Sequence, residues 1–182
     1  MQLRKRAAVS LRQLQRLRRT LRRPEHLSDY PLVTSEKLRF ADTDRNGHVS
    51  NAVFAVCCQN ARMELLSDTE RLAVPPDARF VLGRLDLEFR REMHWPGTVE
   101  VGTRVVRVGR CSVNLAQALF VGTTCVAVAR SRAILIATDT RRSTPLSPEL
   151  AGQLWAHAAP PKGTASVTQL AHLALRRWTA PA

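Results

Sequence analysis

Residues 42–54 carry most of the side chains of this chain that could do chemistry. Their sequence is DTDRNGHVSNAVF, which holds two carboxylates, a glycine, a histidine and an asparagine in a short space. A carboxylate can act as a base or a nucleophile, and a glycine turn that leads into a helix leaves backbone N–H groups free to bind an anion. This combination is suited to acyl transfer, in which a base or nucleophile works beside donors that hold an oxyanion.

The same stretch also matches part of a calcium-binding loop. Asp42, Asp44, Asn46 and Gly47 fit the pattern D-x-[DN]-x-[DN]-G, but position twelve is Val53, which has no oxygen to offer. We therefore expect no calcium site. The cysteines, at positions 57, 58, 111 and 125, form no C-x-x-C pair, so we expect no zinc site either. Their spacing is typical of buried thiols in a reducing compartment.

The pattern continues past the loop into a helix-like segment. The string LRFADTDRNGHVSNAVFAVCCQNARMELL resembles the signature of the hotdog-fold acyl-CoA thioesterases of the 4-hydroxybenzoyl-CoA thioesterase type. That signature is roughly D-x-D-x-x-G-H-V-x-N-x-x-Y followed by A-R-x-E, and Phe54 replaces its tyrosine here. The resemblance covers about residues 33–150. It implies an α+β hotdog fold, with an antiparallel β-sheet wrapped around one long central helix, and an acyl-CoA thioesterase that uses no metal or cofactor.

The resemblance also implies roles for individual residues. Asp44 is expected to be the general base or the nucleophile, a choice that stays open, and Asp42 is expected to serve the turn. The N–H groups around Gly47, His48 and Val49 are expected to face the thioester oxygen. The expected site residues are, for catalysis, Asp44, Gly47, His48 and Asn51 and, for substrate binding, Val49, Phe54, Arg90 and Arg130. His48 could instead be bonded within the turn, and Asn51 could instead cap the helix that follows.

Two further expectations follow from the family pattern. Gln59 stands where many family members carry a glutamate, so a non-catalytic protein that binds acyl-CoA or an acyl carrier remains the alternative to an enzyme. Sites in this family lie between subunits, which implies a homodimer or homotetramer.

The charge of the chain is concentrated at its start. The whole chain has a formal net charge of +13, and residues 1–23 hold nine of its 28 basic residues and no acid. We expect a basic amphipathic arm over residues 1–30, a hotdog domain over 31–150 and a tail with short helices over 151–182. The arm could contact a membrane surface weakly, direct the chain to an organelle, or only solubilise it. Without such targeting we expect a cytoplasmic protein that binds no specific nucleic acid.

Periodicity places the elements around the motif. Residues 33–41 read as a strand, and residues 51–66 carry apolar side chains at helical spacing, with Val56 and Met63 expected to widen the buried face. Four more strands are expected at 79–91, 99–108, 112–121 and 125–137, with hairpin turns at Gly109 and Gly122. Short helices are expected over 148–158 and 166–178. One buried helix followed by long strands with tight turns favours an antiparallel sheet around that helix.

Overall fold

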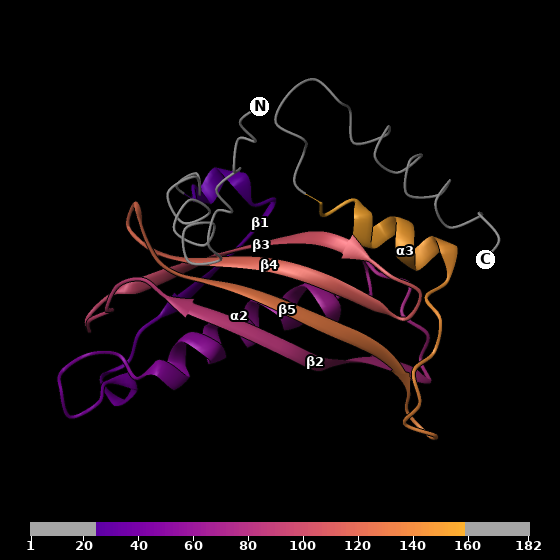
Figure 1. The fold of residues 1–182 in the computed structure, drawn as a ribbon, viewed down its shortest axis with the longest axis horizontal. Helices are drawn as coiled ribbons and strands as arrows, with labels where there is room; N and C mark the ends of the chain where they lie inside the picture. Colours follow the sequence, from indigo (N-terminus) through magenta and orange to yellow (C-terminus); the bar gives the residue numbers. More distant parts are fainter. Residues whose placement is uncertain (1–24, 159–182) are drawn as a thin grey trace, which may run out of the picture.

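The computed structural model describes residues 25–158, and the statements below concern that part of the chain. Residues 1–24 of the arm expected over 1–30, and the expected helix over 166–178, lie outside it. The described elements are η1 (Leu27–Asp29), β1 (Leu32–Lys37), η2 (Phe40–Asp42), α2 (Asn51–Leu66), β2 (Ala78–Phe89), β3 (Thr98–Val108), β4 (Ser112–Val121), β5 (Thr124–Ala137) and α3 (Pro148–Trp155) (Figure 1).

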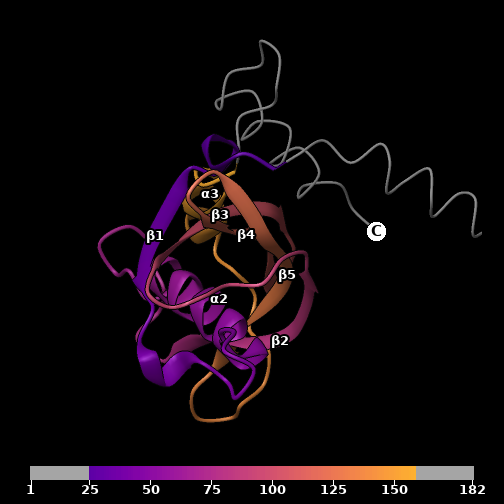
Figure 2. The same ribbon diagram turned by 90° about the vertical axis from the view of Figure 1, so that its left-hand side faces the viewer.

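The strands form one five-stranded sheet in the order β1-β3-β4-β5-β2. All four pairings are antiparallel. The turns between β3, β4 and β5 contain Gly109 and Gly122, and Gly122 has the positive φ of 57° that tight hairpin turns require. Figure 2 shows the sheet curving around α2. The predicted α+β architecture, an antiparallel sheet wrapped around one long helix, is confirmed.

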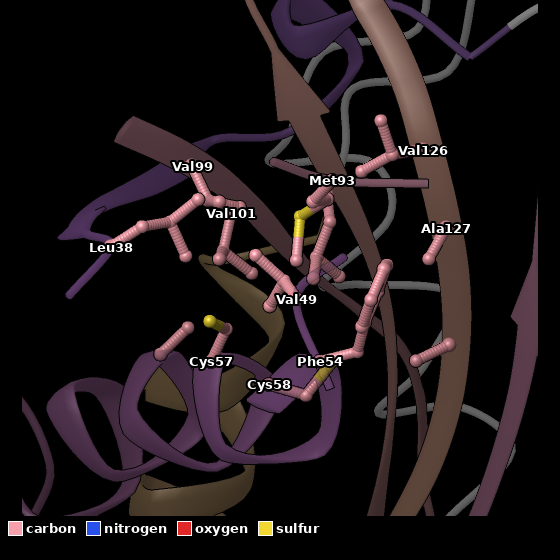
Figure 3. Packing of buried hydrophobic residues seen from close by; sticks show 13 residues of the cluster. Leu38, Val49, Phe54, Cys57, Cys58, Met93, Val99, Val101, Val126 and Ala127 are labelled. Atoms are coloured by element: carbon pink, nitrogen blue, oxygen red, sulfur yellow. The ribbon is translucent and has the colours of Figure 1, made fainter. Parts of the chain in front are cut away.

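Helix α2 buries one stripe of side chains against the sheet. Residues at helical spacing along it are buried, namely Phe54, Cys57, Cys58, Ala61, Arg62, Leu65 and Leu66. Figure 3 shows part of this packing, in which Cys57, Cys58 and Phe54 face Val49, Val101, Met93 and Ala127. The opposite side of α2 exposes Val56 (46%) and Met63 (47%). The expectation that these two side chains widen the buried face is therefore wrong for the single chain.

Burial shifts the pKa values of the polar side chains on the buried face of α2. Burial raises the pKa of the Cys57 thiol to about 11 and that of Cys58 to about 12, so both are neutral thiols at ordinary pH. The Arg62 guanidinium donates to Gln117 Oε1 at 3.1 Å, and burial lowers the pKa of Arg62. Gln117 in turn donates to the Cys58 carbonyl at 3.0 Å. These bonds tie the middle of the helix to β4.

The second helix, α3, closes the other end of the core. Ser147 is its N-cap and accepts the Leu150 N–H at 3.1 Å, with Pro148 in the first turn. Leu150 and Leu154 are fully buried in a cluster with Leu65 of α2 and with side chains of β3, β4 and β5. The predicted short helix beginning at Pro148 is confirmed. None of the helices in residues 25–158 is long and apolar enough to cross a membrane.

Residues 25–30 cover part of the face of the sheet that points away from α2. Tyr30 is buried there, with its ring edge-to-face against Phe120 at 6.3 Å between centroids. Its hydroxyl donates to Glu25 Oε2 at 2.7 Å, and the Arg104 guanidinium lies 4.9 Å from the ring centroid. The ring rests on Gly102 of β3, where any larger side chain would collide with it.

Candidate active site

The motif loop between η2 and α2 is a tight, hydrogen-bonded turn. The Asp44 N–H donates to the His48 carbonyl at 2.8 Å, and the Gly47 N–H donates to the Asp44 carbonyl at 3.1 Å. Gly47 has a φ of 80°. This is the left-handed region, which L side chains rarely adopt, so the glycine is required by the turn itself. The loop is closed at its base by the Ser50 N–H, which donates to the Asp42 carbonyl at 2.9 Å.

The two aspartates of the loop have different surroundings. Asp42 is buried and accepts the Arg39 Nη2–H at 2.8 Å and the Arg39 backbone N–H at 2.7 Å. These hydrogen bonds from Arg39 lower the pKa of Asp42. The carboxylate of Asp44 is exposed, and among the described residues it accepts one hydrogen bond, from the Asn46 N–H at 2.8 Å. Asp44 therefore keeps acceptor positions that a substrate or a water molecule can reach, whereas Asp42 holds the turn.

Two of the three expected oxyanion donors are already in use. The Gly47 N–H is bonded within the turn, and the Val49 N–H donates to the Met93 carbonyl at 2.8 Å. The expectation that Gly47 and Val49 face the thioester oxygen therefore fails for the conformation of this protomer. Within residues 25–158 the His48 N–H has no backbone acceptor, and α2 begins three residues further on, at Asn51. The Val53 N–H already donates to the Ser50 carbonyl at 2.9 Å. Helix N-termini leave their first N–H groups without an intrahelical partner, so the donors present are those of His48, Asn51 and Ala52.

Asn51 is the first residue of α2 rather than its cap. The N-cap is Ser50, whose side chain makes no capping hydrogen bond. The interpretation of Asn51 as the capping residue is therefore wrong. Its side chain is exposed beside the motif loop, which leaves it free to bond a ligand or water.

Val49 and Phe54 lie in the core rather than in an open pocket. Their exposed fractions are 3% and 2%. Figure 3 shows both within the cluster beneath the loop. The Phe54 ring is edge-to-face with that of Phe89 at 5.1 Å, and Phe89 is itself half exposed at the end of β2. Phe54 is therefore covered, while the ring that it contacts is open to solvent.

Arg90 and Arg130 lie together, but not beside Asp44. Both line a hollow of about 470 Å³ that also includes Tyr30, Arg104 and Asp86. Arg130, Ala116, Arg104 and Asp86 are cross-strand neighbours on the face of the sheet opposite to α2. Arg90 sits at one border of this hollow, just after β2, where its guanidinium contacts Glu88 at 3.3 Å.

Segment 90–97, whose residues 92–97 lie beyond the strand expected over 79–91, lies directly against the motif loop. Its Met93 carbonyl accepts the Val49 N–H, and its Gly97 carbonyl accepts the Leu38 N–H at 3.0 Å. This segment brings Glu92 and His94 to His48, and the donor atoms of the three side chains all lie within 4.8 Å of one another. The only signal in the sequence was an acid and a histidine two positions apart after a strand.

Comparison with known proteins identifies the fold. Residues 38–154 match the model of the thioesterase-like superfamily. The PA5185 protein of Pseudomonas aeruginosa superposes with a TM-score of 0.69 at 23% identity, covering 78% of this chain and 100% of its own. A predicted thioesterase of Bacillus stearothermophilus gives 0.64 at 24% identity, covering 71% and 98%. A Thermus thermophilus thioesterase, solved with coenzyme A and zinc, gives 0.63 at 24% identity, covering 73% and 98%. Among curated proteins, none matches this chain. The architecture shared with these neighbours is the hotdog fold.

Proposed function

Because this chain belongs to the thioesterase-like superfamily, a family of thioester hydrolases, we propose that it hydrolyses an acyl-CoA thioester to a free acid and coenzyme A. The observation that carries the proposal is the motif loop, which presents the exposed Asp44 carboxylate beside the first turn of α2. The coenzyme A complex of the Thermus thermophilus neighbour supports this class of substrate.

Asp44 serves as the nucleophile or as the general base. In the first case its free oxygen attacks the thioester carbon, a mixed anhydride forms, the thiolate of coenzyme A leaves, and water then hydrolyses the anhydride. In the second case Asp44 removes a proton from a water molecule that attacks the same carbon directly. Both routes place negative charge on the carbonyl oxygen. The N–H of His48 and the N-terminus of α2 are the donors available to stabilise that charge.

The residues around Asp44 have supporting roles in this proposal. Gly47 fixes the turn, and Asn51 positions the attacking water or the acyl carbonyl from the first position of α2. The His48 imidazole is engaged by Glu92 at 3.2 Å, so His48 contributes through its backbone N–H. Val49 and Phe54 support the loop from the core, and Phe54 holds the half-exposed ring of Phe89, which is placed to contact the acyl chain.

Coenzyme A would extend from the motif loop toward Arg90 and Arg130. Segment 90–97 runs from the border of the arginine-lined hollow to the side of His48. A pantetheine arm that follows this segment would bring the phosphates to Arg90 and Arg130, whose guanidinium groups suit phosphate. The hollow includes no residue of the motif loop, so we expect these two arginines to affect affinity rather than turnover.

The proposal includes a second copy of the chain. Strand β2 is 12 residues long and pairs with β5 on one side; its other edge has no strand partner within residues 25–158. Leu82 and Phe89 on this strand are 49% and 47% exposed. A long unpaired edge with exposed apolar side chains favours pairing with another chain. We therefore propose a homodimer through β2, or a tetramer built from it, which would cover Phe89 beside the motif loop.

The alternative is a hotdog protein that binds acyl-CoA without turnover. Gln59 favours it, because Gln59 is exposed on α2 and offers no carboxylate where related enzymes carry one. The two functions differ in one observation. A panel of acyl-CoA substrates that are bound but release no free thiol would support the binding protein.

The deciding experiment compares Asp44→Asn with Asp42→Asn. The amide oxygen that the first substitution introduces can still accept the Asn46 N–H, so the turn should persist while kcat falls about 10²–10⁴-fold. Asp42→Asn weakens the contact with Arg39 and should lower stability while keeping most of kcat. The measurements are kcat by free-thiol release on a saturating acyl-CoA, and circular dichroism for folding. Full kcat in Asp44→Asn, or a folded but inactive Asp42→Asn, would overturn the assignment.

A further inference from the structure

His48, Glu92 and His94 form a cluster of metal-ligand type beside the motif loop. His48 Nε2 lies 3.2 Å from Glu92 Oε2, and His94 Nε2 lies 3.8 Å from the same oxygen. The two imidazole rings are edge-to-face, with their centroids 5.1 Å apart. All three donor atoms lie within 4.8 Å of one another.

The backbone brings these side chains together. Met93 is buried in the core beneath the loop, and its carbonyl accepts the Val49 N–H at 2.8 Å. Because Met93 points inward, its neighbours Glu92 and His94 project outward, where they meet His48 from the facing loop. The cluster is therefore built on two segments that the core and a backbone hydrogen bond already hold in place.

The donor set and the two distances to Glu92 Oε2 fit a tetrahedral ion. Two histidines and one glutamate are a ligand set of zinc sites that keep the fourth position open. With metal–ligand bonds of about 2.0–2.1 Å, the donor atoms of a tetrahedral site lie about 3.3–3.4 Å apart. The two contacts to Glu92 Oε2, at 3.2 and 3.8 Å, bracket that value. Both imidazoles approach the same carboxylate oxygen, as two ligands of one ion would.

We propose that His48, Glu92 and His94 bind a divalent transition-metal ion, with Zn²⁺ the best fit. Imidazole nitrogen selects against calcium and magnesium, which take oxygen ligands. The side chains are 36%, 64% and 59% exposed, so a water molecule or a ligand atom can fill the fourth position. The ion would link the motif loop to segment 90–97. This site goes beyond the hydrolase function. It departs from the expectation of no metal, which rested on the family resemblance, the cysteine spacing and the incomplete calcium loop.

The test measures zinc binding without any substrate, so it does not depend on the proposed hydrolysis. The full-length protein is stripped with a chelator and titrated with Zn²⁺ by calorimetry, and with Co²⁺ to record the visible spectrum of tetrahedral coordination. We expect one site per chain and a rise in Tm with Zn²⁺. His94→Ala and Glu92→Gln should each weaken binding at least about 10-fold, since even indirect supports of a metal site cost that much.

His26→Ala is the matched control, since it removes an exposed imidazole outside the cluster. It should bind Zn²⁺ as the wild type does. The proposal is overturned if the wild type shows no binding at zinc concentrations up to the submillimolar range. It is equally overturned if folded His94→Ala and Glu92→Gln bind zinc as tightly as the wild type, because another group would then be the site.

Discussion

Gly102 on β3 is the position where the smallest substitution should have the clearest effect. A Cβ added there would lie 2.6 Å from Tyr30 Cγ and 2.8 Å from Tyr30 Cβ and Cδ2. Carbon atoms pack at about 3.5–4.0 Å, so the tyrosine must move by about 1 Å. Such a movement strains the edge-to-face contact with Phe120 and the hydrogen bond to Glu25.

The expected size of the effect combines two opposing contributions. Overpacking a buried site costs about 1–3 kcal/mol. Replacing a glycine within a strand by alanine returns about 0.5–1 kcal/mol, because the unfolded chain loses freedom. Gly102→Ala should therefore lower the free energy of unfolding by about 1–2 kcal/mol, and Tm by about 2–8 °C for a chain of this size.

The same substitution at two other glycines provides matched controls. At Gly152, in the exposed middle of α3, an added Cβ meets nothing within 4 Å, so alanine should stabilise by up to about 1 kcal/mol. At Gly83 the added Cβ meets the flexible Ile134 Cδ1 at 2.7 Å, and we expect a change of less than about 1 kcal/mol. Thermal unfolding by circular dichroism gives all three values.

The order of the three variants decides the outcome. Gly102→Ala must be the least stable and Gly152→Ala the most stable. In a Tyr30→Ala background, the cost of Gly102→Ala should shrink, because the ring that it displaces is gone. A neutral Gly102→Ala, or an unchanged cost without the tyrosine ring, would refute the packing of residues 25–30 on β3.

Two further predictions concern assembly and the thiols. Leu82→Lys on the β2 edge should shift a dimer toward monomer in sedimentation, while Val106→Lys, which changes a comparably exposed valine on β3, should not; a wild type that is monomeric and fully active at micromolar concentration would contradict the dimer. In native protein only Cys111 and Cys125, of the thiols at 57, 58, 111 and 125, should react with a thiol reagent, since Cys57 and Cys58 are buried and protonated; Cys125 should react more slowly than Cys111, because partial burial raises its pKa as well. Unfolding should release all four, and a third reactive thiol in folded protein would contradict the packing of α2.

Much of the fold could be predicted because its signals are local. The helix over 51–66 and the strand over 112–121 have the predicted bounds, since apolar periodicity and glycine turns mark their ends. The choice of helix cap failed because Ser50 and Asn51 are both good caps and the sequence does not say where the backbone turns. The exposure of Val56 and Met63 on α2 could not be predicted, because hydrophobicity does not reveal whether a side chain packs within its own chain or against another.

The candidate site was predicted only in part, because its geometry depends on contacts distant in sequence. The loop itself follows from Gly47 and the flanking motif. The occupation of the Val49 N–H by Met93, and the meeting of His48 with Glu92 and His94, depend on how segment 90–97 lies on the loop. Segment 90–97 has no periodicity that would place it. Likewise, Arg90 and Arg130 are separated from Asp44 because their hollow lies on the face of the sheet opposite to α2, and the sequence does not show which face each side chain takes.

The strand order has a consequence for how the chain reaches this structure. Strands β3, β4 and β5 form a meander whose short turns bring neighbouring residues together, such as Val121 and Thr124. The outer strands close much longer loops, since Leu32 pairs with Thr103 and Ala78 with Ala137. Closing a longer loop costs more entropy, and long-range pairing slows folding. We therefore expect the meander to form first, and the motif loop, which lies between η2 and α2, to acquire its shape when the edges of the sheet close around the helix.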